Sequence, residues 1–399
     1  MRHGNLSFAS LFSGCGGFDL GFCDRGFRSE GAFDSDFDAI QNFTANIEAP
    51  AHQVDLTNGV PNEGALRDLD ALIAGPPCQG FSTVGKRLLD DKRNHLLTLT
   101  GTLARRLRPR VLIVENVVGA LSGQHARYFE SLEFTMRLAG YRTHTIKCHA
   151  ADLGMAQLRR RVFFFAWRTG RDVSFAFPRL APGKLRIALA GVHHYPNHRV
   201  RRLTPGSREW FIAKHIKPGQ KLSNVRGGKN SVATWDIPEV FGPISEHERT
   251  VLELLRRLRR QERQRDYGDA DPVSLARLEA ALGKRFHKIV DRLASKGYLK
   301  RVEGGVDLVG TFNGTFRRLS WEKPSCAVDT KFGYARLFLH PSEQRGFTVR
   351  EAARIQGFDD NYLFRGCEQS QYRLIGNAVP PPLGKLAAEF TLRMLGRSL

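Results

Sequence analysis

The chain has 399 residues, of which 41% are apolar and 25% are charged. This length allows two or three domains with cores of their own, and the composition excludes a disordered chain, a short disulfide-stapled module and a membrane protein. The formal net charge is +21, and because residues 1–150 hold 16 basic and 16 acidic side chains, the whole excess lies after residue 150. Such an excess predicts a polyanionic partner or an acidic membrane surface.

The cysteines are dispersed, with no Cys-x-x-Cys pair and no histidine nearby at zinc-ligand spacing. We therefore expect reduced thiols, no bound metal and a cytoplasmic protein. No stretch approaches the roughly 18 consecutive apolar residues of a membrane span, and the first residues lack the apolar run of a signal peptide. Neither secretion nor membrane insertion is expected. The six cysteines are Cys15, Cys23, Cys78, Cys148, Cys326 and Cys367.

Up to about residue 175, short apolar runs typical of strands alternate with amphipathic stretches typical of helices. The clearest strands are predicted at 69–75, 110–117 and 161–168. Such alternation predicts an α/β fold with a mainly parallel sheet covered by helices. From 177 to about 229 the sequence is rich in Pro, Gly, His and Arg and has weak periodicity, which indicates a separate, irregular and basic domain.

Residues 246–309 form a distinct stretch within that basic region. A helix is predicted over 246–264, with Val251, Leu254, Leu255 and Leu258 on one face and arginines on the others. Two further helices are predicted in 274–283 and 284–297, followed by two strands around 303–305. Three helices and a hairpin resemble a winged-helix module, although any small helical insertion with a hairpin would give the same pattern.

The segment FASLFSGCGGFDLGF (8–22) starts as an apolar strand and breaks into Gly14, Gly16 and Gly17 before it becomes amphipathic. Glycines between a first strand and a helix let the backbone approach a ligand closely, and an acidic residue near the end of the second strand can hold a ribose. Asp36 lies 19 residues after Gly17. The pattern predicts a nucleotide-like cofactor, and a tight packing turn is the alternative.

Two motifs place reactive side chains at the ends of later strands. In ALIAGPPCQGFS (71–82) two prolines stiffen the loop before Cys78 and fix the direction of its thiol, which suits a nucleophile better than a core cysteine. The strand that ends in VENV (114–117) projects Glu115 from the edge where α/β sheets bind ligands. An incidental exposed thiol and a helix-capping carboxylate are the alternatives.

A third motif, QLRRRVFFFAWR, enters a strand. Alternation along the strand turns Gln157, Arg159 and Arg161 to one face and Arg160 to the other. A solvated strand edge is the alternative. Taken together in this order and at these distances, the glycine turn, GPPCQGFS, VENV and QLRRR resemble the DNA cytosine-5 methyltransferase family of bacterial restriction-modification systems.

Two closing blocks add to this resemblance, RGFTVREAARIQGFDDNY (345–362) and YRLIGNAVPPPLGKLAAE (372–389). The resemblance implies a Rossmann-like, S-adenosylmethionine-dependent methyltransferase core made of 1–176 and 330–399. The smaller target recognition domain would then be 177–329, with the winged-helix-like insert inside it.

The resemblance also implies catalytic roles. Cys78 matches the nucleophile that attacks carbon-6 of a cytosine, which makes carbon-5 nucleophilic enough to accept a methyl group. Glu115 matches the acid that holds the ring nitrogen and exocyclic amine of the base, a role that requires a raised pKa and therefore a site closed to water. Arg161 matches the contact to the cytosine carbonyl oxygen, and Arg159 supports the same side.

The cofactor implied by the resemblance is S-adenosyl-L-methionine, with S-adenosyl-L-homocysteine as the product. Its methionine and adenosine portions would be lined from the glycine turn, its ribose held by the acid after the second strand, and its adenine contacted from two later loops. Further pocket positions return from the C-terminal part of the chain. The matching residues are Phe12, Cys15, Gly17, Asp36, Phe37, Asp55, Leu56, Leu96, Asn377 and Val379.

The implied partner is double-stranded DNA, from which the enzyme must flip the cytosine out of the stack. We expect a monomer in the cytoplasm with no membrane partner, and a cognate restriction endonuclease that acts separately. Two other functions fit the same sequence: a tRNA cytosine-5 methyltransferase with the same catalytic set, and a DNA-binding regulator with a vestigial methyltransferase core. The large basic insert and intact motifs favour the DNA enzyme.

Overall fold

The computed structural model describes residues 6–77, 95–177, 179–261, 271–283 and 286–397. The chain divides into two compact units. The large unit comprises Met1–His198, Glu322–Lys331 and Val349–Leu399, and the small unit comprises Arg199–Trp321 and Phe332–Thr348. Each unit is described by itself.

These limits differ from the division predicted from sequence, which assigned all of 177–329 to the recognition domain. Residues after 177 belong to the large unit because the Leu180 N–H donates to the Asp152 carbonyl (2.7 Å) and the Leu185 N–H donates to the Lys323 carbonyl (3.3 Å). Conversely, 332–348 belongs to the small unit because its strand Phe338–Leu339 pairs with Arg317–Arg318 there. Backbone pairing, which composition does not reveal, sets these limits.

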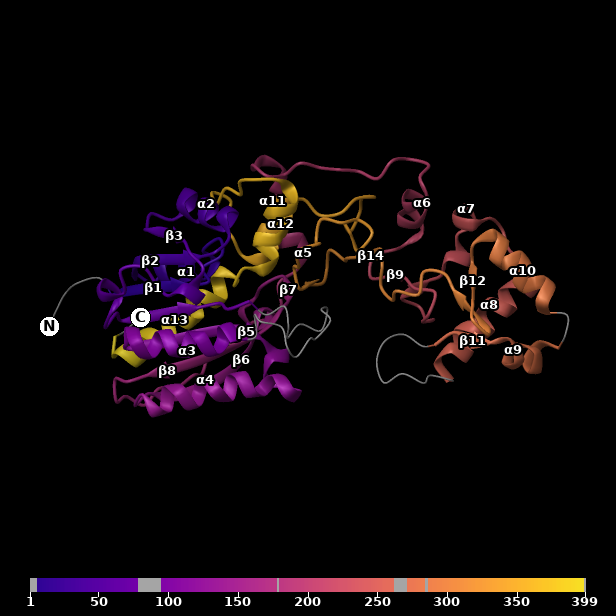
Figure 1. The fold of residues 1–399 in the computed structure, drawn as a ribbon. Helices are drawn as coiled ribbons and strands as arrows, with labels where there is room; N and C mark the ends of the chain where they lie inside the picture. The colour runs from indigo at the N-terminus through magenta and orange to yellow at the C-terminus, as the bar shows by residue number, and fades with distance from the viewer. Residues whose placement is uncertain (1–5, 78–94, 178, 262–270, 284–285, 398–399) are drawn as a thin grey trace. The chain divides into compact units, whose positions relative to one another are not determined.

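The centre of the large unit is a seven-stranded sheet with the strand order β3-β2-β1-β4-β5-β8-β6 (Figure 1). From β3 to β5 all neighbours are parallel, whereas β8 runs antiparallel to both β5 and β6. The mainly parallel sheet predicted from sequence is therefore confirmed. The strands are β1 (Ser7–Leu11), β2 (Arg28–Asp34), β3 (Ala51–Gln53), β4 (Ala71–Ala74), β5 (Val111–Val117), β6 (Arg142–His149) and β8 (Arg160–Trp167), with a separate short pair, β7 (Gln157–Leu158) and β15 (Ser325–Cys326).

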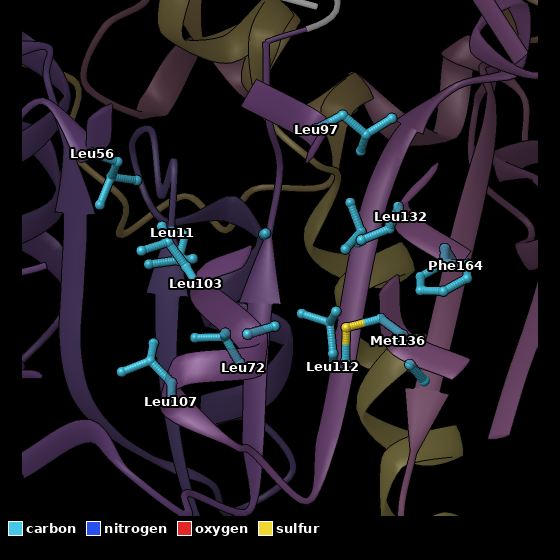
Figure 2. Close-up of a cluster of buried hydrophobic side chains, with 14 of the residues drawn as sticks. Leu11, Leu56, Leu72, Leu97, Leu103, Leu107, Leu112, Leu132, Met136 and Phe164 are labelled. Atoms are coloured by element: carbon cyan, nitrogen blue, oxygen red, sulfur yellow. The ribbon is translucent and has the colours of Figure 1, made fainter. Parts of the chain in front are cut away.

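Helices cover both faces of this sheet, so its central strands are apolar on both sides. Leu72 and Leu112 face a core shared with α3 and α4, which Figure 2 shows, whereas Ile73 and Ile113 face a core shared with α1 and α13. The helices of this unit are α1 (Gly17–Cys23), α2 (Phe37–Asn46), α3 (His95–Leu107), α4 (Ala126–Leu138), α5 (Leu185–Ala188), α11 (Val349–Gln356), α12 (Glu368–Asn377) and α13 (Pro381–Leu395).

Helix α13 brings the C-terminal part of the chain back against α1. The two helices meet at glycines: a Cβ atom on Gly21 would lie 2.2 Å from the backbone nitrogen of Lys385, and one on Gly384 would lie 2.8 Å from the carbonyl oxygen of Phe18. Only residues without a side chain allow this contact. It joins the glycine turn after β1 to the segment that precedes α13.

The described residues of the small unit form two hydrophobic cores. One packs α6 and α7 against β9 and β16, and the other lies inside α8–α10 and the sheet β11-β13-β12. The elements of this unit are α6 (Arg208–His215), β9 (Lys221–Leu222), β10 (Ser231–Val232), α7 (Pro238–Phe241), α8 (Glu246–Gln261), β11 (Val273–Ser274), α9 (Leu275–Leu282), α10 (Phe286–Lys296), β12 (Leu299–Val302), β13 (Gly305–Leu308), β14 (Arg317–Arg318) and β16 (Phe338–Leu339).

The three strands predicted most clearly from sequence correspond to β4, β5 and β8, and the predicted helices of the insert correspond to α8, α9 and α10. One detail of α8 differs: Leu252 is fully buried, whereas Leu254, which was predicted on the apolar face, is only half-buried. In the described part of the chain, no helix combines the length and the apolar character needed to cross a membrane.

Candidate active site

A cavity of about 340 Å³ lies in the large unit, at the carboxyl ends of β1, β2, β4 and β5. This is the edge of an open α/β sheet where ligands bind, and the volume is in the range of small-molecule sites. Nine of the predicted site residues line it together. They are Phe12, Asp36, Asp55, Leu56, Leu96, Glu115, Arg161, Asn377 and Val379.

The glycine turn after β1 forms one wall of the cavity. Phe12 and Gly14 both have positive φ angles (55° and 56°), a conformation that costs a phenylalanine free energy and is typical of functional sites. The turn is held by Asp34, whose Oδ2 accepts from the Gly14 N–H at 2.8 Å. Burial raises the pKa of Asp34, and the N–H groups of Asp36 and Gly14 partly offset that effect. Sequence reasoning missed Asp34, although it precedes the predicted ribose ligand by two residues.

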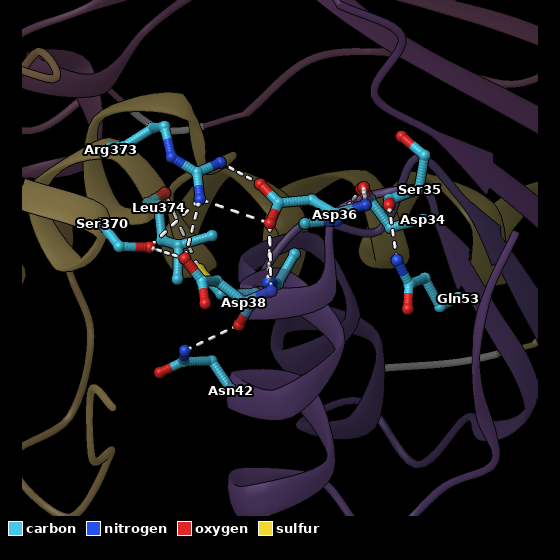
Figure 3. Close-up of polar contacts among 12 residues, drawn as sticks. Asp34, Ser35, Asp36, Asp38, Asn42, Gln53, Ser370, Arg373 and Leu374 are labelled. Atoms are coloured by element: carbon cyan, nitrogen blue, oxygen red, sulfur yellow. Dashed lines mark hydrogen bonds and ion pairs between the residues drawn. The ribbon is translucent and has the colours of Figure 1, made fainter. Parts of the chain in front are cut away.

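Asp36 lies at the N-terminus of α2, where its Oδ1 accepts from the Asp38 N–H at 3.0 Å. Figure 3 shows the Arg373 guanidinium against the same carboxylate and against Asp38. Burial acts to raise the pKa of Asp36, but the hydrogen bond and charge of Arg373, together with the helix N–H groups, outweigh it and the pKa is lowered. Asp36 therefore faces the cavity as a carboxylate of fixed orientation.

Arg373 also lines the cavity and was not predicted. It lies one helical turn before Asn377 on α12, so the two side chains share one face of that helix. Because Asn377 was a predicted pocket residue, this spacing is the signal that could have found Arg373 from sequence.

Three residues predicted to bind the cofactor do not line the cavity. Cys15 is buried beneath it, with its Sγ 3.7 Å from the Leu374 carbonyl, and burial raises the pKa of its thiol to about 12. Gly17 lets the backbone of Val379 approach closely, because a Cβ atom at position 17 would lie 2.3 Å from the carbonyl oxygen of Val379. Phe37 is 56% exposed and is absent from the described lining.

Glu115, near the end of β5, is paired with Arg161, near the start of β8. The antiparallel register brings these strand ends together, and Arg161 Nε lies 2.7 Å from Glu115 Oε1. Burial raises the pKa of Glu115, while the charges of Arg161 and Arg159 act in the opposite direction. The result is an acid with a raised pKa at the cavity, beside a fixed cation.

Arg159 lies outside the cavity lining, although it was predicted as a catalytic residue on the same side as Arg161. It is 2% exposed, and its guanidinium donates to the carbonyls of Val328 (2.9 Å), Gly376 (3.1 Å) and Ala378 (3.0 Å). Gly376 and Ala378 line the cavity. Arg159 therefore acts as a positioning residue that holds the chain after α12 against the sheet.

The loop after β4 reaches the cavity through Pro76 and Pro77. Asn116, which follows Glu115 on β5, donates from Nδ2 to the Pro76 carbonyl at 3.3 Å. This buried hydrogen bond ties the loop to the strand that carries Glu115. The predicted nucleophile, Cys78, is the next residue after Pro77 and lies outside the described residues.

Comparisons with known proteins agree with this geometry. The family model of the C-5 cytosine-specific DNA methylase matches residues 6–391. The chain is 29% identical to the Type II methyltransferase M.AgeI of Thalassovita gelatinovora, over 95% of this chain and 97% of that protein. It is 27% identical to the Type II methyltransferase M1.HphI of Haemophilus parahaemolyticus, over 98% of this chain and 87% of that protein.

Solved structures show the same fold at lower sequence identity. A protein encoded within an E. coli prophage matches with a TM-score of 0.59 and 22% identity, over 98% of this chain and all of that one. The methyltransferase EhMeth of Entamoeba histolytica matches with a TM-score of 0.57 and 13% identity, over 98% of this chain and 99% of that one.

Proposed function

Since the chain belongs to the C-5 cytosine-specific DNA methylase family, we propose that it methylates carbon-5 of one cytosine within a short duplex DNA sequence and that the cavity of the large unit is its active site. The observation that carries this proposal is the buried pair of Glu115 and Arg161, which lines the same cavity as Pro76 and Pro77. A buried acid, a fixed cation and the residues leading to a cysteine are the groups that this chemistry needs.

The cavity suits S-adenosylmethionine in both size and lining. Phe12, Leu56, Leu96 and Val379 offer apolar surface to the adenine and methionine portions, and the oriented carboxylate of Asp36 can accept hydrogen bonds from ribose hydroxyls. When bound, S-adenosylmethionine supplies a methyl group on a positively charged sulfur. The remaining residues proposed to contact it, Asp55 and Asn377, also line the cavity.

Cytosine activation rests on three side chains. The Cys78 thiolate adds to carbon-6 of the flipped base, and the electron pair of the carbon-5–carbon-6 double bond moves toward the ring nitrogen. Protonated Glu115 gives its proton to that nitrogen, while Arg161 holds the carbonyl oxygen of the base. Carbon-5 then takes the methyl group, which leaves S-adenosylhomocysteine as the product, and the ring-nitrogen proton returns to the Glu115 carboxylate. Loss of the carbon-5 proton to water, with departure of the Cys78 sulfur as a thiolate, restores the ring.

The small unit is proposed to be the DNA-recognition part of the enzyme. It holds 28 Lys and Arg against 15 Asp and Glu. Four of its arginines, Arg199, Arg201, Arg202 and Arg226, are exposed and therefore accessible to phosphate or to guanine edges. The enzyme is proposed to act apart from any cognate restriction endonuclease, as a cytoplasmic monomer.

The test is methyl transfer from labelled S-adenosylmethionine to plasmid DNA and, in parallel, to tRNA. We expect transfer to DNA only, at one short sequence that sequencing of 5-methylcytosine will identify. Replacing the nucleophile, in Cys78→Ala, should lower the rate by at least about 10³-fold. The exposed Cys367 provides a matched control, since Cys367→Ala should transfer at the wild-type rate. Full-rate transfer by Cys78→Ala, or transfer to tRNA alone, would contradict the proposal.

A further inference from the structure

The insert of the small unit has the connectivity of a helix-turn-helix followed by a β-hairpin. Its elements follow in the order α8, β11, α9, α10, β12 and β13, and its antiparallel sheet has the order β11-β13-β12. Helix α9 ends at Gly283, which has a φ of 69°, and α10 begins at Phe286. A helix that ends at a glycine and is followed closely by a second helix is typical of the helix-turn-helix, whose second helix reads DNA.

The insert has its own core and its own buried ion pair, so its surface is held in a defined arrangement. The buried sides of α8, α9, α10 and the three strands form one cluster that includes Leu255, Leu278 and Val290. Arg259 of α8 and Asp307 of β13 pair inside it, with Nε and Oδ1 2.6 Å apart. This pair ties the first helix to the hairpin.

The outer face of α10 is polar and basic. Phe286, Val290 and Leu293 are buried, which leaves the opposite face of the helix to solvent. Residues 286–302, which include α10 and the first hairpin strand, hold five basic side chains against one acidic. The exposed side chains of α10 are His287, Lys288, Asp291, Arg292 and Ser295.

The hairpin adds cations beside this face. Lys300 and Arg301 of β12 are exposed, and the turn at Glu303-Gly304 joins β12 to β13, with a φ of 69° at Gly304. Arg301 pairs with Asp291, the one acidic residue on the outer face of α10, so the hairpin lies against the helix. Within the described residues, Lys288 has no ion-pair partner.

The chemistry of this surface indicates its partner. Large exposed hydrophobic side chains, which anchor protein–protein interfaces, occur elsewhere on the chain but not within the described residues of 246–308. A basic helix face with an adjoining basic hairpin instead complements a major groove and its phosphates.

We propose that the insert is a winged-helix module that binds duplex DNA through the outer face of α10 and the β12–β13 hairpin, in addition to the contacts made by the rest of the small unit. This inference rests on the proposed function only for the identity of the substrate. In it, α10 lies in the major groove, and Lys288 and Lys300 contact phosphates.

The experiment compares the full-length enzyme with the double variant Lys288→Ala/Lys300→Ala. Binding to a duplex that carries the mapped site, and to a duplex of unrelated sequence, is measured at several salt concentrations. We expect about tenfold weaker binding of both duplexes near physiological salt, and a slope of log affinity against log salt that is smaller by about 2. Turnover at saturating DNA and S-adenosylmethionine affinity should stay at wild-type values.

Arg257→Ala, which removes an exposed cation from α8, is the matched control and should leave the salt slope unchanged. An unchanged slope in the double variant, an equal change in Arg257→Ala, or a larger loss for duplex RNA than for DNA would overturn the inference. Binding to the unrelated duplex does not depend on methyl transfer. The proposal that the insert binds DNA can therefore fail or hold independently of the proposal that the enzyme methylates DNA.

Discussion

The large and small units carry their charge in different ways. The large unit holds 33 basic and 25 acidic side chains, and both arginines at the cavity are in ion pairs, Arg161 with Glu115 and Arg373 with Asp36. The small unit is shorter but carries a larger excess of basic side chains, and Lys288, Arg292 and Lys300 remain exposed even though Arg292 and Lys300 also lie near Glu248 and Asp307. Substitutions at the cavity should therefore change turnover or cofactor affinity, whereas substitutions on α10 should change the salt dependence of DNA binding.

The largest effect is expected from Glu115→Gln, which keeps the shape of the side chain but removes its proton. We expect turnover to fall by roughly 10²- to 10³-fold, because general acid catalysis contributes about this much. Burial raises the pKa of Glu115, and the protonated form is the active one in the proposed mechanism. The wild-type rate should therefore decline as the pH rises through the pKa of Glu115, and a pH–rate profile of Glu115→Gln should lack that decline.

A matched control is Glu389→Gln, since Glu389 also pairs with an arginine, Arg25, but does so away from the cavity. Its turnover and pH profile should follow the wild type. Neither variant should change the salt slope of DNA binding. A change of that slope in Glu115→Gln would contradict the assignment of catalysis to the large unit and of DNA binding to the small unit.

Arg159→Ala tests whether a buried arginine of the large unit is structural. The substitution leaves three backbone carbonyls without their donor, so we expect the free energy of unfolding to fall by about 3 kcal/mol in urea denaturation. S-adenosylmethionine should also bind more weakly, because Gly376 and Ala378 line the cavity. Unchanged stability together with lost turnover would instead identify Arg159 as a catalytic residue.

Much of the fold could be predicted from the sequence, because the apolar runs of β4, β5 and β8 and the apolar face of α8 are local patterns. The unit limits could not be predicted in this way. They depend on the pairing of β14 with β16 and of β7 with β15, which join segments distant in the chain. Such pairs are too short to leave a periodic signal.

The residues at the cavity were predictable where a motif lies at one end of a strand: Asp36 and Glu115 lie at or near the ends of parallel strands, and Arg161 lies near the start of the antiparallel strand β8. The sequence could not show where a side chain lies when tertiary packing decides its direction. Arg159 was predicted on one strand face with Arg161, yet it lies between β7 and β8 and extends toward the backbone after α12. Only the three-dimensional path of that segment distinguishes the two arginines.

The smallest expected effect is that of Arg373→Ala, which removes the guanidinium from the Asp36 carboxylate. With only the N–H groups of α2 left to orient it, Asp36 should hold a ribose less well, and we expect S-adenosylmethionine affinity to fall by roughly three- to tenfold in calorimetry. Turnover at saturating cofactor and the salt slope of DNA binding should not change. Arg373→Lys should recover part of the affinity, because an ammonium keeps the charge but not the paired hydrogen bonds. If Arg373→Ala altered the salt slope, this cation of the large unit would itself be contributing to DNA binding. The difference between ion-paired charges at the cavity of the large unit and exposed cations on α10 of the small unit would then no longer hold.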